Sequence, residues 1–515
     1  MLGALRPRGE VEETAADDGL LAGTQRLRIV DAERAAQPWI SADGRWLVCF
    51  NGEIYNYRPL RGELAGLGCR LRSESDTEVL AEAFARWGEQ AVPRLRGEFA
   101  FAVADRSSGR VYLARDRLGV KPLYWSVRGG CLHVASEIKA LVGIGAPVFE
   151  VPPGAHGWAG HGAAPALSGY STVLSPGTAR DVLPLTDAAE AAAMIRESLA
   201  DSIRVRVPAD RTVGVILSGG LDSSLTLLHA RRAHPDCVAF TVGAPGSQDI
   251  AVARRLAADL GVRHEVIEVQ PRQIRLAEIT EAIRISELTE YGDIINAVVS
   301  VPLFRRVAEL GIRVVLTGDG SDELFGGYPM YERIGHDAGQ RLFLHKLGNL
   351  HRTELQRVDR TSMAHGVEAR VPFLDPAVVE VAMRLPLSLK VRGGTEKWIL
   401  RQAFAQILPE YVLRRPKNPM SYSSGLHERA RLYKPLFARV HRSFGYDLHE
   451  PVRRDFSVQL ERSGHDLDLA IAQAARRLDY SPREHARDLA GAAKWNAASL
   501  VGALASAGRV PGGHA

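Results

Sequence analysis

A short segment rich in glycine and serine could bind a phosphate group. It reads Ser218-Gly-Gly-Leu-Asp-Ser-Ser224, follows the apolar run Val213–Leu217 and precedes an apolar helix. A glycine-rich turn between a strand and a helix points backbone N–H groups and the positive end of the helix dipole at an anion. Asp222 would repel a bare phosphate, so we interpret it as a ligand of a Mg²⁺ ion that lies between the two. A serine N-cap would explain only the first residues of the segment, and the sequence has no Walker A lysine, so the segment is not a P-loop.

A second segment places three carboxylates in a glycine-rich loop. It reads Thr317-Gly-Asp-Gly-Ser-Asp-Glu-Leu-Phe-Gly-Gly-Tyr328 and continues the apolar run that starts at Ile312. Open α/β sheets bind their ligands at the carboxyl ends of strands, which is where this loop lies. We expect Asp322 to be the second Mg²⁺ ligand, and Asp319 and Glu323 to contact substrate or transfer a proton. The alternative is an acidic turn on the surface.

Buried parallel strands must position both segments. Apolar runs without alternation are typical of strands buried on both faces of a parallel sheet. Such runs alternate here with helical segments, which predicts βαβ units and a doubly wound sheet. From residue 373 onward the pattern is mostly helical and should cover that sheet. The predicted strands are 213–217, 237–242, 264–269 and 312–317, and the helices between and before them include 187–205 and 250–260.

The first third of the chain has a different pattern, with short strands and one clear helix at Asp76–Trp87. Residues 141–185 are rich in Gly, Pro, Ala and Ser, which is typical of the passage between two domains. We therefore predict an N-terminal α+β domain over 1–180, an α/β domain over 181–505 and a frayed tail over 506–515. The predicted strands of the first domain are 46–51, 98–105, 111–116 and 131–136.

The composition excludes several classes of protein. The 515 residues are 46% hydrophobic and 24% charged, as in ordinary globular chains. A net charge of +5 without basic clusters argues against a nucleic-acid partner. No apolar run is long enough to span a membrane, and no signal core follows the first residue, so we expect a cytoplasmic protein. The four cysteines form no CxxC and lie in or beside apolar runs, so we interpret them as small buried hydrophobic residues.

Together these segments resemble the asparagine synthetase family of ATP pyrophosphatases. The similarity extends to three further segments of the second domain: Phe240–Ser247, Gly366–Asp375 and Glu396–Arg401. The first third resembles the class-II glutamine amidotransferase domain of the same enzymes, an Ntn-type sandwich. The segments that carry this second resemblance are Arg26–Asp31, Asn51–Asn56, Ser75-Asp76 and Arg115–Tyr124.

The resemblance implies a two-step reaction. ATP adenylylates a carboxylate and releases pyrophosphate, and an amine then displaces AMP to leave an amide. Lys397 would stabilise charge that develops on the phosphate, a role that suits a compact cation on a flexible stem; a surface salt bridge is the alternative. Family members often form homodimers. The residues implied to bind ATP, pyrophosphate and Mg²⁺ are Leu217, Ser218, Gly219, Gly220, Asp222, Ser223, Ser224, Val242, Thr317, Gly318 and Asp322, and the glutamine pocket would be Arg26, Asn51, Gly52, Glu53 and Asp76.

The N-terminal domain departs from the family at its nucleophile. Family members hydrolyse glutamine with a cysteine at the mature N-terminus, whereas this sequence starts Met-Leu-Gly and its first cysteine is Cys49, inside a predicted strand. The match also begins partway into the domain, without the first strands of the sandwich. As written, the chain should not hydrolyse glutamine. Either the true start codon lies upstream, or the domain is a scaffold; we favour the first, because the residues of the glutamine pocket remain.

The acceptor site departs as well. Asparagine synthetases carry a Thr-Thr-x-Arg segment that binds aspartate, and here the corresponding stretch Asp293–Val299 has Val298 where the arginine is expected. Asp319 replaces the usual glutamate, and Pro419–Gly425 replaces a Phe-Ser-Asp-Gly-Val-Gly segment. The Asp-Ile-Ile run resembles β-lactam synthetases, which deprotonate an amine with a Tyr–Glu pair. Glu354 could be that glutamate, but Asp319 is not that tyrosine.

We therefore expect an ATP-dependent, AMP-forming amide synthetase that uses Mg²⁺, with Lys397, Asp319 and Glu354 as its catalytic residues. Its carboxylate substrate would be aspartate or an acid of specialised metabolism, and its amine would be ammonia, from glutamine or free, or another amine. Two alternatives stay open. One is ring formation of the β-lactam synthetase kind, and the other is a non-catalytic homologue that binds nucleotide.

Overall fold

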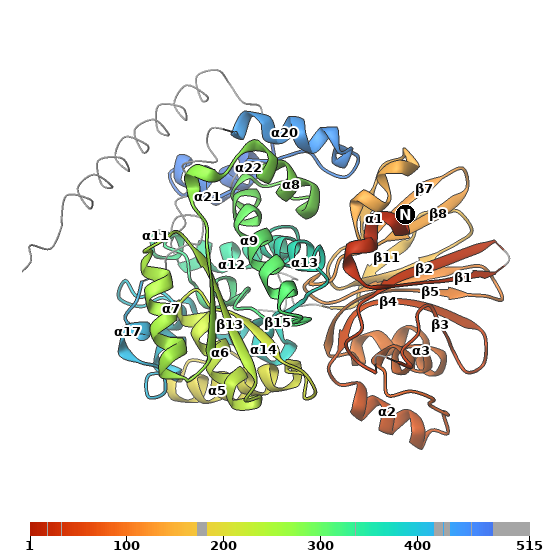
Figure 1. Ribbon diagram of the computed structural model, residues 1–515, viewed down its shortest axis with the longest axis horizontal. Coiled ribbons are helices and arrows are strands. Elements are labelled where there is room, and N and C mark those ends of the chain that lie inside the picture. The colour runs from red at the N-terminus through yellow and green to blue at the C-terminus, as the bar shows by residue number, and fades with distance from the viewer. Residues whose placement is uncertain are drawn as a thin grey trace, which may run out of the picture.

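A five-stranded parallel sheet forms the centre of the C-terminal domain in the computed structural model, as the apolar runs predict (Figure 1). Its strand order is β14-β13-β12-β15-β16, and every neighbouring pair is parallel. The order reverses between β12 and β15, which are hydrogen-bonded neighbours. This reversal is the point at which open α/β sheets bind ligands. The strands are β12 (Val213–Ile216), β13 (Cys237–Gly243), β14 (Arg263–Glu268), β15 (Val314–Leu316) and β16 (Glu368–Arg370).

Helices cover both faces of this sheet and bury two apolar cores. Helix α5, which has 19 residues, begins at an N-cap: the side chain of Asp187 accepts a hydrogen bond from the N–H of Glu190 (2.7 Å). The predicted helical character after residue 373 is confirmed over the described part of that region. The helices are α5 (Ala188–Arg206), α6 (Leu221–Ala233), α7 (Gln248–Asp259), α8 (Leu276–Ser286), α9 (Tyr291–Glu309), α10 (Ser321–Phe325), α11 (Met330–Arg333), α12 (His336–Asn349), α13 (Glu354–Met363), α14 (Pro376–Arg384), α15 (Leu387–Lys390), α16 (Trp398–Ala403), α17 (Glu410–Leu413), α20 (Lys434–Ser443), α21 (Phe456–Arg462) and α22 (Leu467–Ala474).

The N-terminal domain is built on an antiparallel sheet with the order β11-β10-β6-β5-β4-β3. Helices α2 and α3 cover one of its faces (Figure 1). Ser75 caps α3 by accepting a bond from the N–H of Glu78 (3.2 Å). The elements are β3 (Trp39–Ile40), β4 (Trp46–Ile54), α2 (Tyr57–Gly66), α3 (Asp76–Trp87), β5 (Gly97–Asp105), β6 (Val111–Arg115), β10 (Ala155–Ala159) and β11 (Ala166–Gly169).

A second layer faces the other side of this sheet. It consists of a short helix, a hairpin and a three-stranded sheet with the order β8-β7-β9. The layered α+β architecture of the first domain and the parallel sheet of the second confirm the predicted fold class. The elements are α1 (Leu2–Leu5), β1 (Val11–Asp17), β2 (Leu20–Arg26), β7 (Tyr124–Arg128), β8 (Cys131–Ala135) and β9 (Phe149–Glu150).

Two expectations about the first domain need correction. The glycine-rich stretch 141–185 is not only a passage between domains, because it contains β9, β10 and β11, and β10 pairs with β6 inside the main sheet. Cys131 is exposed and not a buried hydrophobic residue, because it starts β8 directly after the turn at Gly129-Gly130. Cys237 is buried as expected, and Cys49 and Cys69 are half-buried.

The structure describes residues 1–17, 19–31, 33–171, 183–334, 336–416, 426, 433–454 and 456–476. The predicted domain boundary at residue 180, the segment Pro419–Gly425 and the tail 506–515 lie outside these residues. Within them, no helix is long and apolar enough to cross a membrane.

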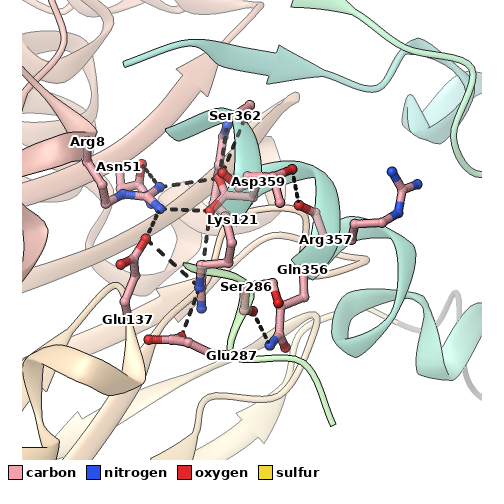
Figure 2. A network of polar contacts seen from close by, with 12 residues as sticks. Arg8, Asn51, Lys121, Glu137, Ser286, Glu287, Gln356, Arg357, Asp359 and Ser362 are labelled. Atoms are coloured by element: carbon pink, nitrogen blue, oxygen red, sulfur yellow. Dashed lines mark hydrogen bonds and ion pairs between the residues drawn. The ribbon is translucent and has the colours of Figure 1, made fainter. Parts of the chain in front are cut away.

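A buried network of charges joins the two domains (Figure 2). Arg8 of the first domain forms ion pairs with Glu137 (2.6 Å) and with Asp359 of α13 (2.9 Å). Arg360 binds Glu287 at 3.0 Å and Asp359 at 3.1 Å. All five side chains are nearly inaccessible to water, so each charge depends on its partners.

Because of this network, acid should weaken the contact between the domains. Burial by itself would raise the pKa of Glu137, but Lys139, Arg8 and Arg360 lower it from 4.5 to about 2. A carboxylate whose pKa is lowered on folding stabilises the fold above its ordinary pKa, and this contribution is lost as the pH falls through the lowered value. We expect the difference in unfolding free energy between wild type and Glu137→Gln to reach about 3 kcal/mol above pH 5. Urea unfolding should show that this difference in unfolding free energy decreases toward pH 2. A difference that does not depend on pH would contradict this expectation.

Candidate active site

The turn after β12 has the geometry of an anion site. Gly219 has a φ of +70°, which side chains rarely tolerate, and Gly220 is the N-cap of the 13-residue helix α6. The N–H of Ser218 donates to the hydroxyl of Ser223 (3.1 Å), and the hydroxyl of Ser224 donates to the carbonyl of Gly220 (2.7 Å). These hydrogen bonds hold the serines at the N-terminus of α6, where the helix dipole favours a negatively charged ligand.

The loop after β15 packs directly against this turn. The hydroxyl of Ser321 donates to Oδ1 of Asp222 (2.6 Å). A Cβ atom at Gly318 would lie 3.0 Å from Cβ of Asp222 and 3.2 Å from the nitrogen of Ser223. A glycine at position 318 therefore lets the two loops touch. The structure thus brings together the two segments that the sequence singled out.

Lys397 joins the aspartates of the two loops. Its Nζ forms ion pairs with Asp322 (2.5 Å) and with Asp222, and the side chain is 3% exposed. A Cβ at Gly327 would come within 2.4 Å of Cε of Lys397, so only glycine fits there. Lys397 itself has a φ of +53°, a conformation that costs a non-glycine residue about 1 kcal/mol or more. Its partners are the buried Asp222 and the half-buried Asp322, and not a surface carboxylate.

Two arginines that the sequence did not single out lie beside this site. Arg415 donates to the carbonyl of Ser218 (3.2 Å) and pairs with Asp249, and Arg401 pairs with Glu396 at 2.9 Å. Both arginines line a small cavity together with Ser218, Asp222 and Lys397. Arg401 lies within α16 and Arg415 follows the end of α17, and no spacing signal in the sequence relates either of them to the serine turn.

The other residues implied to bind nucleotide lie at the carboxyl ends of the same strands. The N–H of Leu217 donates to the carbonyl of Phe240 (2.8 Å), and its own carbonyl accepts a bond from the hydroxyl of Thr241 (2.6 Å). Val242 is almost buried at the end of β13, and the N–H of Thr317 donates to the carbonyl of Arg370 (3.1 Å). Their placement is compatible with the implied role, which stays a prediction.

Asp319 and Glu354 belong to two different pairs. Asp319 binds Arg357 of α13 at 2.7 Å. The hydroxyl of Tyr328 lies 3.4 Å from Oε1 of Glu354 and donates to Glu323. Burial and the neighbouring carboxylates raise the pKa of Glu323 to about 8. Burial would also raise the pKa of Glu354, but Lys346 and a bond from Thr353 hold it below its usual value.

Val298 does not face this group. It is 5% exposed and packs in the apolar core between α9 and neighbouring helices, which includes Phe437. The same helix instead directs Ser300 toward the group, where it accepts a bond from Arg357 (3.2 Å). The position of the expected arginine is therefore part of the apolar core here.

The residues of the predicted glutamine pocket are only partly brought together. A cavity of about 680 Å³ between the two layers of the first domain is lined by Arg26, Asn51 and Gly52. Glu53 and Asp76 do not line it. Glu53 pairs with Arg370 of the other domain (2.8 Å), and Asp76 accepts a bond from the N–H of Ile54 (3.1 Å). Burial raises the pKa of Asp76 to about 7 and that of Glu53 well above its usual range.

Cys49 also lines this cavity. Burial raises the pKa of its thiol to about 12, so the thiolate that nucleophilic attack requires is almost absent at neutral pH. Residues of β2 and β8 also line this cavity. Among the described strands, β8 is an edge strand of its three-stranded sheet and β2 pairs only with β1.

Comparison with known proteins gives two family models that match consecutive parts of the chain. A glutamine amidotransferase domain matches residues 1–153, and asparagine synthase matches residues 194–337 and 334–459. The glutamine-hydrolysing asparagine synthetase B of Escherichia coli strain K12 is 35% identical over 438 residues, which cover 80% of this chain and 76% of that protein. A glutamine-hydrolysing asparagine synthetase 3 of Arabidopsis thaliana is 33% identical over 467 residues, which cover 84% and 77% of the two chains. A probable glutamine-hydrolysing asparagine synthetase of Schizosaccharomyces pombe is 32% identical over 446 residues, or 78% and 76%.

Proposed function

The chain belongs to the asparagine synthetase family, and on that premise we propose that it is an ATP-dependent amide synthetase that releases AMP and pyrophosphate. The observation that carries the proposal is the position of Lys397, whose buried ammonium group pairs with Asp222 and Asp322 beside the serine turn 218–224. Such an arrangement puts a fixed cation where phosphate charge develops. We assign this activity to residues 181–505 and the amidotransferase-like domain to residues 1–180.

In the first step, an oxygen of the acceptor carboxylate attacks the α-phosphorus of ATP, and the bond to the bridging oxygen breaks. Pyrophosphate leaves into the serine turn, where Ser218, Ser223, Ser224 and the backbone of Gly219 and Gly220 hold it. In the second step, an amine attacks the acyl carbon, AMP leaves with the electron pair, and the amine loses a proton. Lys397 stays close to the phosphate charge throughout.

The residues present fit a magnesium ion. Asp222 and Asp322 offer two carboxylates against the single ammonium of Lys397, so a negative charge remains for a cation. Mg²⁺ in such enzymes is bound by one or two carboxylates together with phosphate oxygens, and it screens the phosphate charge. Among the described residues, no larger group of His, Cys, Asp and Glu could hold a metal without a substrate.

We propose ammonia as the amine, with glutamine as its source. The match to the amidotransferase domain and the cavity lined by Arg26, Asn51 and Gly52 support this source. Cys49 does not support it, because its thiol stays protonated. Free ammonium would bypass that step. We further expect a cytoplasmic enzyme that acts on small molecules and forms homodimers.

One observation favours a second candidate, which is ring closure of the β-lactam synthetase kind. The hydroxyl of Tyr328 donates a hydrogen bond to Glu323 and lies 3.4 Å from Oε1 of Glu354. A Tyr–Glu pair that could deprotonate an amine therefore lies next to Asp322. In this case the amine would belong to the acceptor molecule itself. Turnover would then need no added ammonium or glutamine.

The test is pyrophosphate release from Mg-ATP in the presence of aspartate, with ammonium, glutamine or neither. Release with ammonium, together with asparagine, supports aspartate as the acceptor. Release that is equally fast with glutamine supports a working amidotransferase domain. Release with another acid and no added amine favours ring closure. Absence of release with every acid, with or without ammonium, would contradict the proposed function, and omission of Mg²⁺ is the control.

A further inference from the structure

A polar cluster is formed by side chains of the loop after β15 and of the helices α9, α12 and α13. It is next to the site of Lys397, because Glu323 directly follows Asp322 in the chain. Four carboxyl groups contribute to it: Asp293, Asp319, Glu323 and Glu354.

The described residues supply fewer cations than carboxyl groups to this cluster. Arg357 is engaged by Asp319 at 2.7 Å. Lys346 lies over the ring of Tyr328 (4.8 Å), and burial by itself would lower its pKa, but carboxylates led by Glu354 raise it. In the described part of the cluster, Arg357 and Lys346 therefore face these four carboxyl groups, and Glu290 is close enough to act on Asp293 and Lys346 as well. Burial of such a surplus is costly, so a group such as Asp293 stays protonated unless a further cation stabilises its charge.

Asp293 is the carboxyl group with the fewest compensating contacts. It is 8% exposed, and its side chain has no hydrogen bond or ion pair with any residue that the structure describes. Burial and the charge of Glu354 raise its pKa well above the usual range. Asp293 lies in the first turn of α9, where the helix dipole favours an acid, but that position supplies no cationic partner for the carboxyl group.

Tyr331 adds an independent sign of a ligand. The residue is 1% exposed, and its hydroxyl has no hydrogen-bond partner among the described residues. Its ring is fixed by stacking on Phe343, with centroids 4.1 Å apart and planes at 11°. Burial, Glu323 and Asp322 raise the pKa of this hydroxyl, so it lies close to the carboxyl groups of the cluster. A buried hydroxyl oxygen without a partner can accept a bond from an N–H donor of a ligand.

We propose that the acceptor acid carries a protonated amine, which this cluster binds, and no second free carboxylate. The inference rests on the proposed function, since the cluster lies beside the site where the acceptor would be adenylylated. A ligand ammonium would neutralise the surplus carboxyl charge and satisfy Tyr331. Among the described residues, Arg357, Lys346 and Lys397 are each engaged by carboxylates, so a second carboxylate of the ligand would have to compete for these cations.

Three acids that differ by one charged group test this inference. 3-Aminopropanoate is aspartate without its α-carboxylate, and succinate is aspartate without its amine. Calorimetric titration of the full chain, with Mg²⁺ and α,β-methylene-ATP present, should show 3-aminopropanoate binding about tenfold more tightly than succinate. Aspartate should bind less tightly than 3-aminopropanoate. The longer pairs 4-aminobutanoate and glutarate, and 5-aminopentanoate and adipate, should show the same preference if the amine lies farther from the reacting carboxylate.

A variant with one charge removed makes the test specific to the cluster. Asp293→Asn keeps the size of the side chain and has no described partner to lose, so it should fold, and the preference for the amino acids should fall about tenfold. Tyr331→Phe should lower the preference for the amino acids less than Asp293→Asn does. Glu281→Gln on the exposed side of α8, whose nearest cation is Arg305 at 3.6 Å, is the matched control and should leave the preference unchanged.

The inference is overturned if the dicarboxylates bind as tightly as the amino acids at every length, if no acid binds, or if Asp293→Asn and Glu281→Gln have equal effects. Failure of the proposed function would look different. If the amino acids bind but no acid supports pyrophosphate release, then the synthetase chemistry is wrong and the binding preference stands. If release occurs with dicarboxylates only, the chemistry stands and the inference fails.

Discussion

Replacement of Lys397 by alanine should lower the rate of pyrophosphate release from Mg-ATP by about 10³-fold while the protein still folds. Lys397 is the cation that touches both aspartates of the nucleotide site, and it is 3% exposed. Fixed groups that stabilise developing charge in a site shielded from water typically contribute about 10²–10³-fold each. The two aspartates can still hold Mg²⁺ in the variant, so binding of ATP should change far less than turnover.

Two further variants separate this effect from a general loss of positive charge. Lys397→Arg should not restore activity, because a planar guanidinium is larger than an ammonium and Gly327 leaves no space beside the side chain. Arg392→Ala removes an exposed cation that lies over Trp398, near the start of α16, and should leave turnover unchanged. Equal turnover in wild type and Lys397→Ala, with unaltered folding, would remove the proposed mechanism.

Replacement of Arg360 by methionine should lower the free energy of unfolding by about 3–5 kcal/mol. Arg360 is 1% exposed, pairs with Glu287 and Asp359 and donates to the hydroxyl of Tyr124 (3.3 Å). Without the guanidinium, these carboxylates stay buried with fewer partners, and most of the loss comes from that uncompensated charge. Urea unfolding measures the effect, and limited proteolysis would show whether the two domains separate first.

A double variant and a surface control make this prediction specific. Adding Glu287→Gln to Arg360→Met removes one of the uncompensated charges, so part of the lost stability should return. Arg305→Met breaks an exposed pair with Glu281 (3.6 Å) and should cost less than about 1 kcal/mol. A loss for Arg360→Met no larger than that of Arg305→Met would show that the buried network does not hold the domains together.

The loops of the nucleotide site could be predicted because their signal is local. A buried strand, a glycine-rich turn and a helix follow each other within about a dozen residues, and this order alone fixes where Asp222 and Asp322 lie. A role of Lys397 beside the phosphate could only be implied by resemblance, and its pairing with these aspartates was not predicted. Position 397 follows position 222 by 175 residues, and no rule of spacing connects them.

Elements stabilised by distant charges escaped prediction. Strand β16 is three residues long and has Glu368 and Arg370 at its ends, so it lacks the apolar pattern of a buried strand. Arg370 is nevertheless buried, because it pairs with Glu53 of the other domain. Val298 stands where the arginine of the family is expected, and the sequence could not show where this side chain lies. It packs in the apolar core.

The most direct measurement of the proposed chemistry follows an oxygen atom. An acceptor acid labelled with ¹⁸O at both oxygens of its reacting carboxylate is incubated with Mg-ATP, ammonium and the full chain, and the mass of the AMP formed is measured by mass spectrometry. The acid that gives the fastest pyrophosphate release is used. We predict that one ¹⁸O atom appears in AMP for each amide formed, because the carboxylate oxygen stays on phosphorus when the amine attacks. Products consisting of ADP and phosphate, or AMP without the label, would contradict adenylylation of the carboxylate.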